Sequence, residues 1–122
     1  MGQLLIKNAK LVNENTQREC DILLENNFIQ RIDSSISPKN AKVIDVEGKY
    51  ILPGMIDDQV HFREPGLTQK GTIATESRAA LAGGITTYME QPNTVPQTTT
   101  IEKLEEKFNI GANTSFANYS FL

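Results

Sequence analysis

The apolar residues up to about Pro53 come in short runs that polar, turn-forming residues separate. These runs are Leu4–Ile6, Ile22–Leu24, Phe28–Ile29, Val43–Ile44 and Tyr50–Leu52. Short apolar runs between turn signals are typical of strands. Asn26–Asn27, between two of the runs, predicts a tight hairpin because asparagine tolerates a positive φ. We therefore expect residues 1–53 to form a small β-sheet domain.

After Pro53–Gly54 the pattern changes to alternating strand and helix signals. The predicted order is a strand over 55–62, a helix over 72–82, a strand over 85–89, a helix over 99–111 and a strand over 115–122. Connections that contain a helix are long enough for the strands they join to be parallel. The second part of the chain therefore reads as a β-α-β-α-β unit.

Both helices carry boundary signals. In the first, Gly83–Gly84 predicts the end, and the expected inner face consists of Ile73, Ser77, Ala80 and Leu81. In the second, Thr99-x-x-Glu102 matches a capping box and Gly111 is expected to end the helix. Its expected inner face consists of Ile101, Leu104 and Phe108.

Three parallel strands with two helices leave open sheet edges and uncovered apolar surface. A closed eight-unit β/α barrel needs about 250 residues. We therefore interpret the chain as truncated, with an α/β fold class: the start of a β/α (TIM-type) barrel over residues 54–122, preceded by a partial β-sheet accessory domain over 1–53. The alternative is a compact, small α/β domain that is complete as it stands.

Composition narrows the class of protein. The chain has 122 residues, 39% hydrophobic and 22% charged, which is ordinary globular composition. A net charge of −3 gives no basic field for nucleic acid or anionic lipid. The single Cys20 excludes an internal disulfide and fits a reducing compartment. With no run near the ~20 apolar residues of a membrane span and no signal-peptide core, we expect a cytoplasmic protein.

Most of the candidate functional residues lie at the end of the first predicted strand of the second part. If residues 55–63 are all extended, Asp57, Gln59, His61 and Arg63 share one face because side chains alternate. In β/α architectures the carboxyl ends of strands are where sites are built. The imidazole suits a metal ligand or general base, and the guanidinium suits a carboxylate or phosphate. Asp58, on the opposite face, is expected to cap or pair.

Each of these residues also has a purely structural interpretation. His61 is the sole histidine, and a lone histidine is often satisfied within a core or loop. Arg63 has Glu64 beside it for a local ion pair. Asn93 lies in the second loop, between Pro92 and Pro96, and its side chain can hydrogen-bond to an amide or carboxylate of a small substrate. The same side chain also suits a turn that satisfies its own backbone.

Four stretches together carry a resemblance. They are Pro53–Asp57 before the site strand, His61–Gly66 (His-Phe-Arg-Glu-Pro-Gly), Ala82–Thr87 (Ala-Gly-Gly-Ile-Thr-Thr) and Pro92–Pro96 (Pro-Asn-Thr-Val-Pro). Over most of its length the chain resembles the N-terminal portion of dihydroorotases of the amidohydrolase superfamily. The first fifty residues are similar to the small β-domain that flanks the barrel in that family.

The resemblance implies a zinc-dependent, reversible hydrolysis of the cyclic amide of dihydroorotate to carbamoyl-aspartate, in pyrimidine biosynthesis. His61 would bind metal, and Arg63 and Asn93 would bind the substrate carboxylate. Bound metal would activate a water and polarise the amide carbonyl. No catalytic acid or base is assigned within this chain, because the family's remaining ligands and catalytic aspartate belong to later strands. The implied partner is a small molecule, without nucleic acid or membrane, and a homo-oligomer is compatible with it.

One position departs from the family pattern. The metal motif His-x-His reads Gln59-Val60-His61 here, and a neutral amide oxygen is a poor zinc donor. An altered site with one zinc instead of two is one consequence. The alternative is a non-catalytic dihydroorotase-like subunit with a structural role for another pyrimidine enzyme. A related hydantoinase or allantoinase is a further alternative, against which Arg63-Glu64-Pro65-Gly66 favours the dihydroorotase branch.

Overall fold

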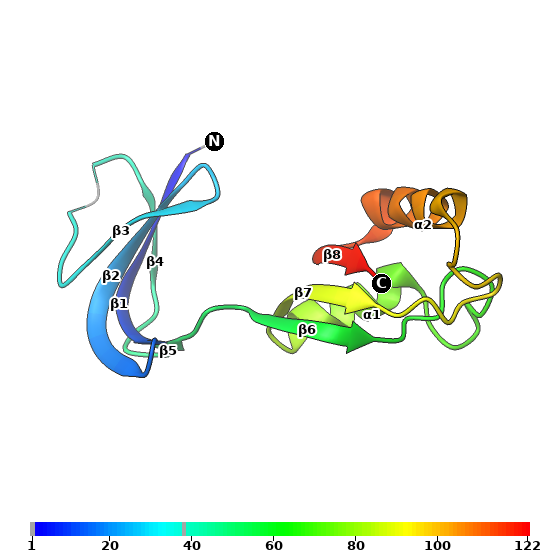
Figure 1. Ribbon diagram of the computed structural model, residues 1–122. Helices are drawn as coiled ribbons and strands as arrows, with labels where there is room; N and C mark the ends of the chain where they lie inside the picture. The colour runs from blue at the N-terminus through cyan, green and yellow to red at the C-terminus, as the bar shows by residue number, and fades with distance from the viewer. Residues whose placement is uncertain (1, 38) are drawn as a thin grey trace. The chain divides into compact units, whose positions relative to one another are not determined.

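The computed structural model describes residues 2–37 and 39–122 and divides into two compact units, Met1–Pro53 and Gly54–Leu122 (Figure 1). Within the described residues, none of the helices is both long and apolar enough to span a membrane.

The first unit is a sheet of five strands. They are β1 (Gln3–Asn13), β2 (Thr16–Glu25), β3 (Phe28–Asp33), β4 (Lys42–Asp45) and β5 (Tyr50–Ile51). The order is β3-β2-β1-β4, with β5 also paired to β1 (Figure 1). Asn26 and Asn27 have φ of 50° and 69° and join β2 to β3, which confirms the predicted hairpin. Ala9, Leu11, Cys20 and Ile22, from β1 and β2, form the buried hydrophobic cluster of this unit.

A buried carboxylate organises one side of this sheet. Asp21 is 3% exposed and accepts hydrogen bonds from the Lys7 ammonium (2.8 Å) and from the backbone N–H groups of Asn8 (3.0 Å) and Ile36 (2.9 Å). Burial alone raises the pKa of this carboxyl. The hydrogen bonds from Lys7, Ile36 and Asn8 outweigh burial, so the pKa lies below its ordinary value of 3.8.

We expect Asp21→Asn to lower the free energy of unfolding at pH 7 by about 2 kcal/mol, because an amide cannot accept three hydrogen bonds in place of the carboxylate. A carboxyl with a lowered folded-state pKa stabilises the fold above its unfolded pKa, and this contribution is lost as pH falls. Urea unfolding of both forms at pH 7 and pH 3 should show the difference shrinking at the lower pH. Glu19→Gln, exposed on the same strand, is the control; a difference independent of pH would contradict the assignment.

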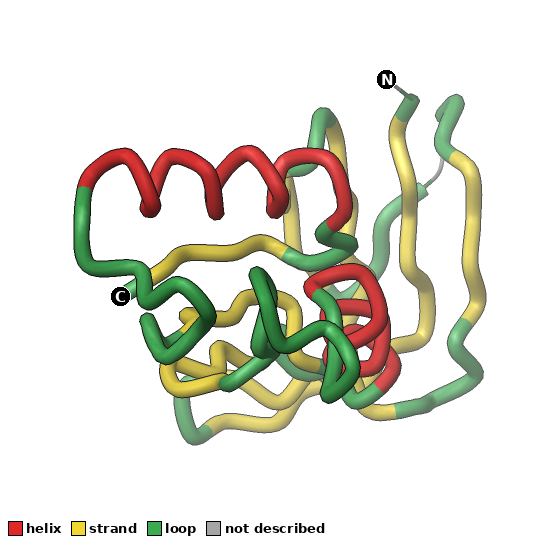
Figure 2. The backbone as a smooth tube through the Cα atoms, turned by 90° about the vertical axis from the view of Figure 1, so that its right-hand side faces the viewer, coloured by secondary structure: helices red, strands yellow, loops and turns green. Residues whose placement is uncertain are grey.

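The second unit confirms the β-α-β-α-β order and the parallel strands. It contains β6 (Met55–Val60), α1 (Ile73–Ala82), β7 (Ile85–Glu90), α2 (Ile101–Thr114) and β8 (Asn118–Phe121). The sheet order is β6-β7-β8, all parallel. Figure 2 shows the two helices and the strands of the chain by colour. The buried cluster consists of Phe62, Ile73, Tyr88, Ala117 and Phe121.

Helix α1 follows the prediction closely. Thr72 is its N-cap and accepts a hydrogen bond from the Thr75 N–H at 3.1 Å. Gly83 is the C-cap, and Gly84 has a φ of +88°, so the Gly-Gly pair ends the helix as expected. Ile73 and Ser77 are fully buried, whereas Leu81, expected on the same face, is 39% exposed.

Helix α2 differs from the prediction at both ends and in its buried face. Its N-cap is Thr100, one residue after the expected position, and the helix continues through Gly111 to Thr114. Gly111 lies against Tyr119, where a Cβ would come within 2.7 Å of the ring, so the glycine serves packing rather than termination. Ile101 is 73% exposed, and the fully buried side chain of the helix is Lys107. The inner face therefore follows 104, 107 and 111.

Candidate functional site

The predicted site residues lie in the two loops that follow β6 and β7. These strands are parallel neighbours, so their carboxyl ends meet at one edge of the sheet. Across this edge the His61 Nδ1 lies 3.0 Å from the Asn93 Oδ1, although the residues are 32 positions apart in sequence. The Asn93 side-chain oxygen therefore contacts the imidazole. The alternative prediction was a turn in which this side chain hydrogen-bonds to its own backbone. The structure brings together two of the three residues expected to bind metal or substrate.

The expected shared face of the first strand is wrong beyond Val60. Strand β6 ends there, and its register with β7 is irregular between Asp57 and Val60. The Asp57 Oδ1 accepts the Gln59 N–H at 3.1 Å, a local turn-like contact. His61 and Arg63 therefore lie in a loop, and strand alternation does not set their directions.

Arg63 is held through its backbone. Its φ is +74°, a left-handed conformation that is uncommon for a residue with a side chain. Its N–H donates to the Glu90 Oε1 at 2.9 Å. In the described part of the chain no carboxylate lies within 4.0 Å of the Arg63 guanidinium. The neighbouring carboxylate has another role, because the Glu64 Oε2 accepts the Ile73 N–H at 2.7 Å at the start of α1.

The two loops are joined to each other. The Val95 N–H donates to the Pro65 oxygen at 3.1 Å. Gly66 has a φ of +85°, and a Cβ there would overlap the Val95 carbonyl group. On the other side, the buried Thr94 hydroxyl donates to the Pro96 oxygen at 2.9 Å. The backbone that carries Arg63 and the backbone that carries Asn93 are therefore packed as one body.

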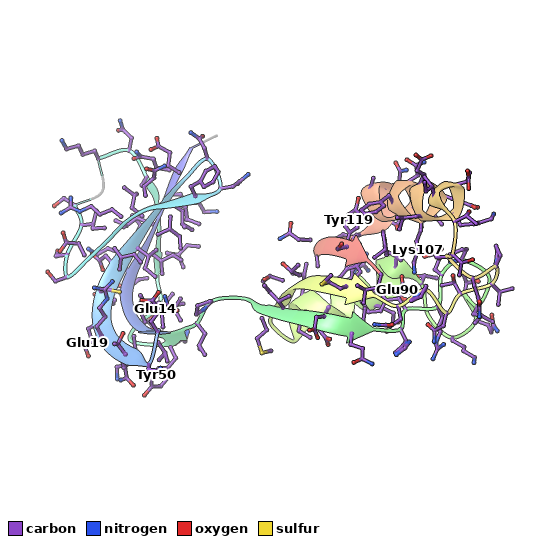
Figure 3. The ribbon with its side chains drawn as sticks, in the orientation of Figure 1. Glu14, Glu19, Tyr50, Glu90, Lys107 and Tyr119 are labelled. Carbon is purple, nitrogen blue, oxygen red and sulfur yellow. The ribbon has the colours of Figure 1, made fainter. Side chains whose placement is uncertain are left out.

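A buried ion pair that the sequence analysis missed lies beneath these loops. The Glu90 Oε2 at the end of β7 and the Lys107 Nζ on α2 are 3.1 Å apart, with side chains 1% and 0% exposed (Figure 3). Burial raises the pKa of Glu90 and lowers that of Lys107, because it disfavours the charged form of each, and their mutual attraction opposes both shifts. The spacing of Lys107 from Leu104 could have indicated this burial, because a residue at i+3 from an inner-face residue lies on the same face of a helix.

Comparison with known proteins agrees with these motifs. A family profile described as dihydro-orotase-like matches residues 48–119, more than half of the chain. The chain belongs to the dihydroorotase-like family. It is 37% identical over 122 residues to a dihydroorotase of Methanosphaera stadtmanae, covering 98% of this chain and 28% of that protein. It is 43% identical over 109 residues to a dihydroorotase of Lactococcus lactis, covering 88% of this chain and 26% of that protein.

A solved structure has the same fold as this dihydroorotase-like chain. An L-hydantoinase (dihydropyrimidinase) from Arthrobacter aurescens superimposes with a TM-score of 0.93 and 32% identity, over 99% of this chain and 27% of that one. The expected α/β fold class and the resemblance to the N-terminal portion of dihydroorotases are thus confirmed. The chain spans about a quarter of the length of the curated relatives that it matches.

The donor set of this dihydroorotase-like chain does not by itself make a metal centre. Among the described residues no three histidine, cysteine or acidic side chains gather as a metal-ligand cluster. His61 is the sole imidazole in the sequence, and Gln59 is exposed with an amide in place of a second one. With its Nδ1–H donating to Asn93, the His61 ring has Nε2 as its free lone pair, the arrangement that a ligating histidine uses. His61 therefore fits the role of one metal ligand, and a complete metal site needs further ligands.

Proposed function

We propose that residues 54–122 form the first β/α units of a barrel, and residues 1–53 part of its accessory domain, in a cytoplasmic cyclic amidohydrolase of the dihydroorotase type. Its reaction is the reversible hydrolysis of dihydroorotate to carbamoyl-aspartate, and its metal is zinc, with His61 as one ligand. The observation that carries the proposal is the 3.0 Å contact between His61 and Asn93 at the carboxyl ends of two parallel strands, with Arg63 two residues after His61 in the same loop.

The roles of the residues follow from their hydrogen-bonding capacity. Because the Asn93 oxygen accepts from His61, the Nδ2–H groups of the same amide are directed to other acceptors such as a substrate carboxylate. The Arg63 guanidinium adds a planar pair of donors and a positive charge. Zinc, when bound, supplies an activated water and polarises the amide carbonyl. Within this chain the residues bind and orient the substrate, and we assign no proton-transfer group to it.

Arg63→Ala in the complete protein is expected to raise KM for dihydroorotate at least tenfold, because the substrate carboxylate loses a charged bidentate partner. Steady-state kinetics over a range of dihydroorotate concentrations measures this. Arg18→Ala, at an exposed position of β2, is the matched control and should leave KM unchanged. An unchanged KM in Arg63→Ala would contradict the substrate-binding role.

Gln59 favours a second candidate, a non-catalytic dihydroorotase-like subunit that supports another pyrimidine enzyme. An enzyme that needs two metal-binding imidazoles at residues 59 and 61 has only one here. Zinc analysis and turnover of the complete protein separate the two. Stoichiometric zinc together with turnover supports the hydrolase. A protein that has neither bound zinc nor turnover supports the non-catalytic subunit. Gln59→His then tests the cause, because a site lacking only this ligand should gain zinc affinity.

The L-hydantoinase likeness favours a third candidate, a hydrolase of an uncharged cyclic amide. Such a substrate has no carboxylate for Arg63 and Asn93 to bind. Comparison of turnover on dihydroorotate with turnover on dihydrouracil decides between the dihydroorotase type and the hydantoinase type. A preference for dihydrouracil that Arg63→Ala leaves unchanged would favour the hydantoinase type.

A further inference from the structure

The carboxylate of Glu90 lies at the point where the two site loops and helix α2 meet. It is fully buried. One oxygen, Oε1, accepts the Arg63 N–H at 2.9 Å. The other, Oε2, faces the Lys107 ammonium at 3.1 Å, and in the described part of the chain no well-aligned hydrogen bond reaches it. A carboxylate shared in this way between a backbone amide and a cation has a fixed orientation.

Lys107 fixes the carboxylate from the side of the helix. Its Nζ also donates to the Gln91 carbonyl oxygen at 3.1 Å and lies 4.9 Å from the centre of the Phe121 ring. Figure 3 labels both members of the pair, one on α2 and one on β7. The ammonium is thus held by the end of β7, the first residue of the Asn93 loop and a strand β8 aromatic ring, and Glu90 cannot move without separating from it.

The backbone at Arg63 needs such support. With a φ of +74° it occupies a region that is strained for a non-glycine residue and that persists only where the surroundings impose it. Its N–H donates to the Glu90 Oε1 at 2.9 Å, and the side chain branches from the Cα that is bonded to this same nitrogen. The direction of the guanidinium therefore depends on where the backbone N–H is anchored.

We propose that Glu90, held by Lys107, is a positioning residue that sets Arg63 for the substrate carboxylate by accepting its backbone N–H. The inference rests on the proposed function for the identity of the ligand. Glu90 is fully buried and acts on the substrate through Arg63, not by direct contact. Because the acceptor acts on ground-state placement of a binding group, its loss should act on KM more than on kcat.

Two variants isolate the acceptor. Glu90→Gln keeps a carbonyl oxygen for the Arg63 N–H, whereas Glu90→Leu removes it. Both eliminate the carboxylate charge and both keep Lys107 with its bond to Gln91. If Glu90→Leu does not fold, Glu90→Asp, which withdraws the acceptor by one methylene group, replaces it with the same expectation. The complete protein is used throughout, with melting temperatures measured for every variant.

The first measurement is hydrogen exchange at the Arg63 amide. In the wild type and in Glu90→Gln this amide should be protected, and in Glu90→Leu it should exchange at least tenfold faster. The Gln91 amide, which donates to the Val60 oxygen at 3.0 Å, is the internal reference and should change little. Equal protection of the Arg63 amide in all three proteins would overturn the proposal, whether or not the protein is an active enzyme.

The second measurement is steady-state kinetics with dihydroorotate. We expect KM to rise at least tenfold in Glu90→Leu, with kcat within about threefold, and Glu90→Gln to stay near the wild type. Equal KM values in the two variants would overturn the positioning role. If the wild-type protein neither binds nor turns over dihydroorotate, the proposed function fails, and the exchange data alone then decide whether Glu90 fixes Arg63.

Discussion

Replacement of Gly66 by alanine is expected to lower the free energy of unfolding of the second unit by about 2–5 kcal/mol. Two costs add in this variant. A side chain at a φ of +85° costs about 1–2 kcal/mol, and the new Cβ overlaps the Val95 carbonyl group, which forces a backbone shift of the overpacking kind that typically costs about 1–3 kcal/mol. Chemical denaturation of the complete protein measures the loss.

Gly84→Ala is the matched control for this variant. Gly84 has a similar φ of +88°, but nothing lies within 4 Å of the position that a Cβ would occupy. It therefore reports the conformational cost alone, about 1–2 kcal/mol, and the excess in Gly66→Ala measures the contact between the two site loops. Equal losses in the two variants would show that this close approach contributes nothing. If Arg63 and Asn93 bind the substrate carboxylate as proposed, Gly66→Ala, which displaces the loops that carry them, should also weaken dihydroorotate binding.

Lys107→Met is expected to cost about 3–5 kcal/mol of unfolding free energy at pH 7, the range for removing one partner of a buried ion pair. The methionine keeps the length and apolar stem of lysine, but the Glu90 carboxylate remains in a fully buried position without a counter-charge. Burial already raises the pKa of Glu90, and removal of Lys107 raises it further. The loss should therefore shrink at acid pH, where the carboxyl binds a proton without cost.

A double-mutant cycle with Glu90→Gln checks the origin of this effect. If the unpaired charge is the cause, Glu90→Gln in the Lys107→Met background should recover part of the stability, and the two substitutions should couple by more than about 1 kcal/mol. Lys103→Met provides the matched control, since Lys103 pairs with Glu106 at the surface and such pairs contribute about 0–1 kcal/mol. Additive losses at residues 90 and 107 would show that the ion pair has no energetic role.

The candidate site was partly predictable because its residues stand beside local signals. His61 and Asn93 each follow a strand that the hydrophobic pattern marks, and strands joined through a helix align their carboxyl ends. The contact between these two side chains was not predictable from spacing, since it joins positions 32 apart. The strand was expected to continue to Arg63, but the pattern of alternating residues cannot show the bulge that breaks register after Asp57.

The buried charges were the largest omission, and the reason is physical. In a sequence, a lysine or glutamate that pairs inside the protein has the same letter as one that faces water, and charged residues are seldom fully buried. Lys107 was therefore not among the residues expected on the inner face of α2, and Ile101 was, whereas the structure buries the first and exposes the second. Gly111 read as a helix end because the ring of Tyr119, which requires it, comes from β8.

The order of elements, the hairpin at Asn26–Asn27, the parallel arrangement of β6, β7 and β8 and the identity of the residues at the strand ends could all be predicted from the residues and their spacing. The order of elements and the hairpin depend on local signals, namely alternation, capping and turn conformations, and the parallel arrangement follows from the helix that each connection contains. The contact of His61 with Asn93, the hydrogen bond from the Arg63 N–H to Glu90 and the buried ion pair of Glu90 with Lys107 are seen in the three-dimensional structure and could not be predicted. Such contacts join groups from different elements, and they exist only after the strands and helices have packed.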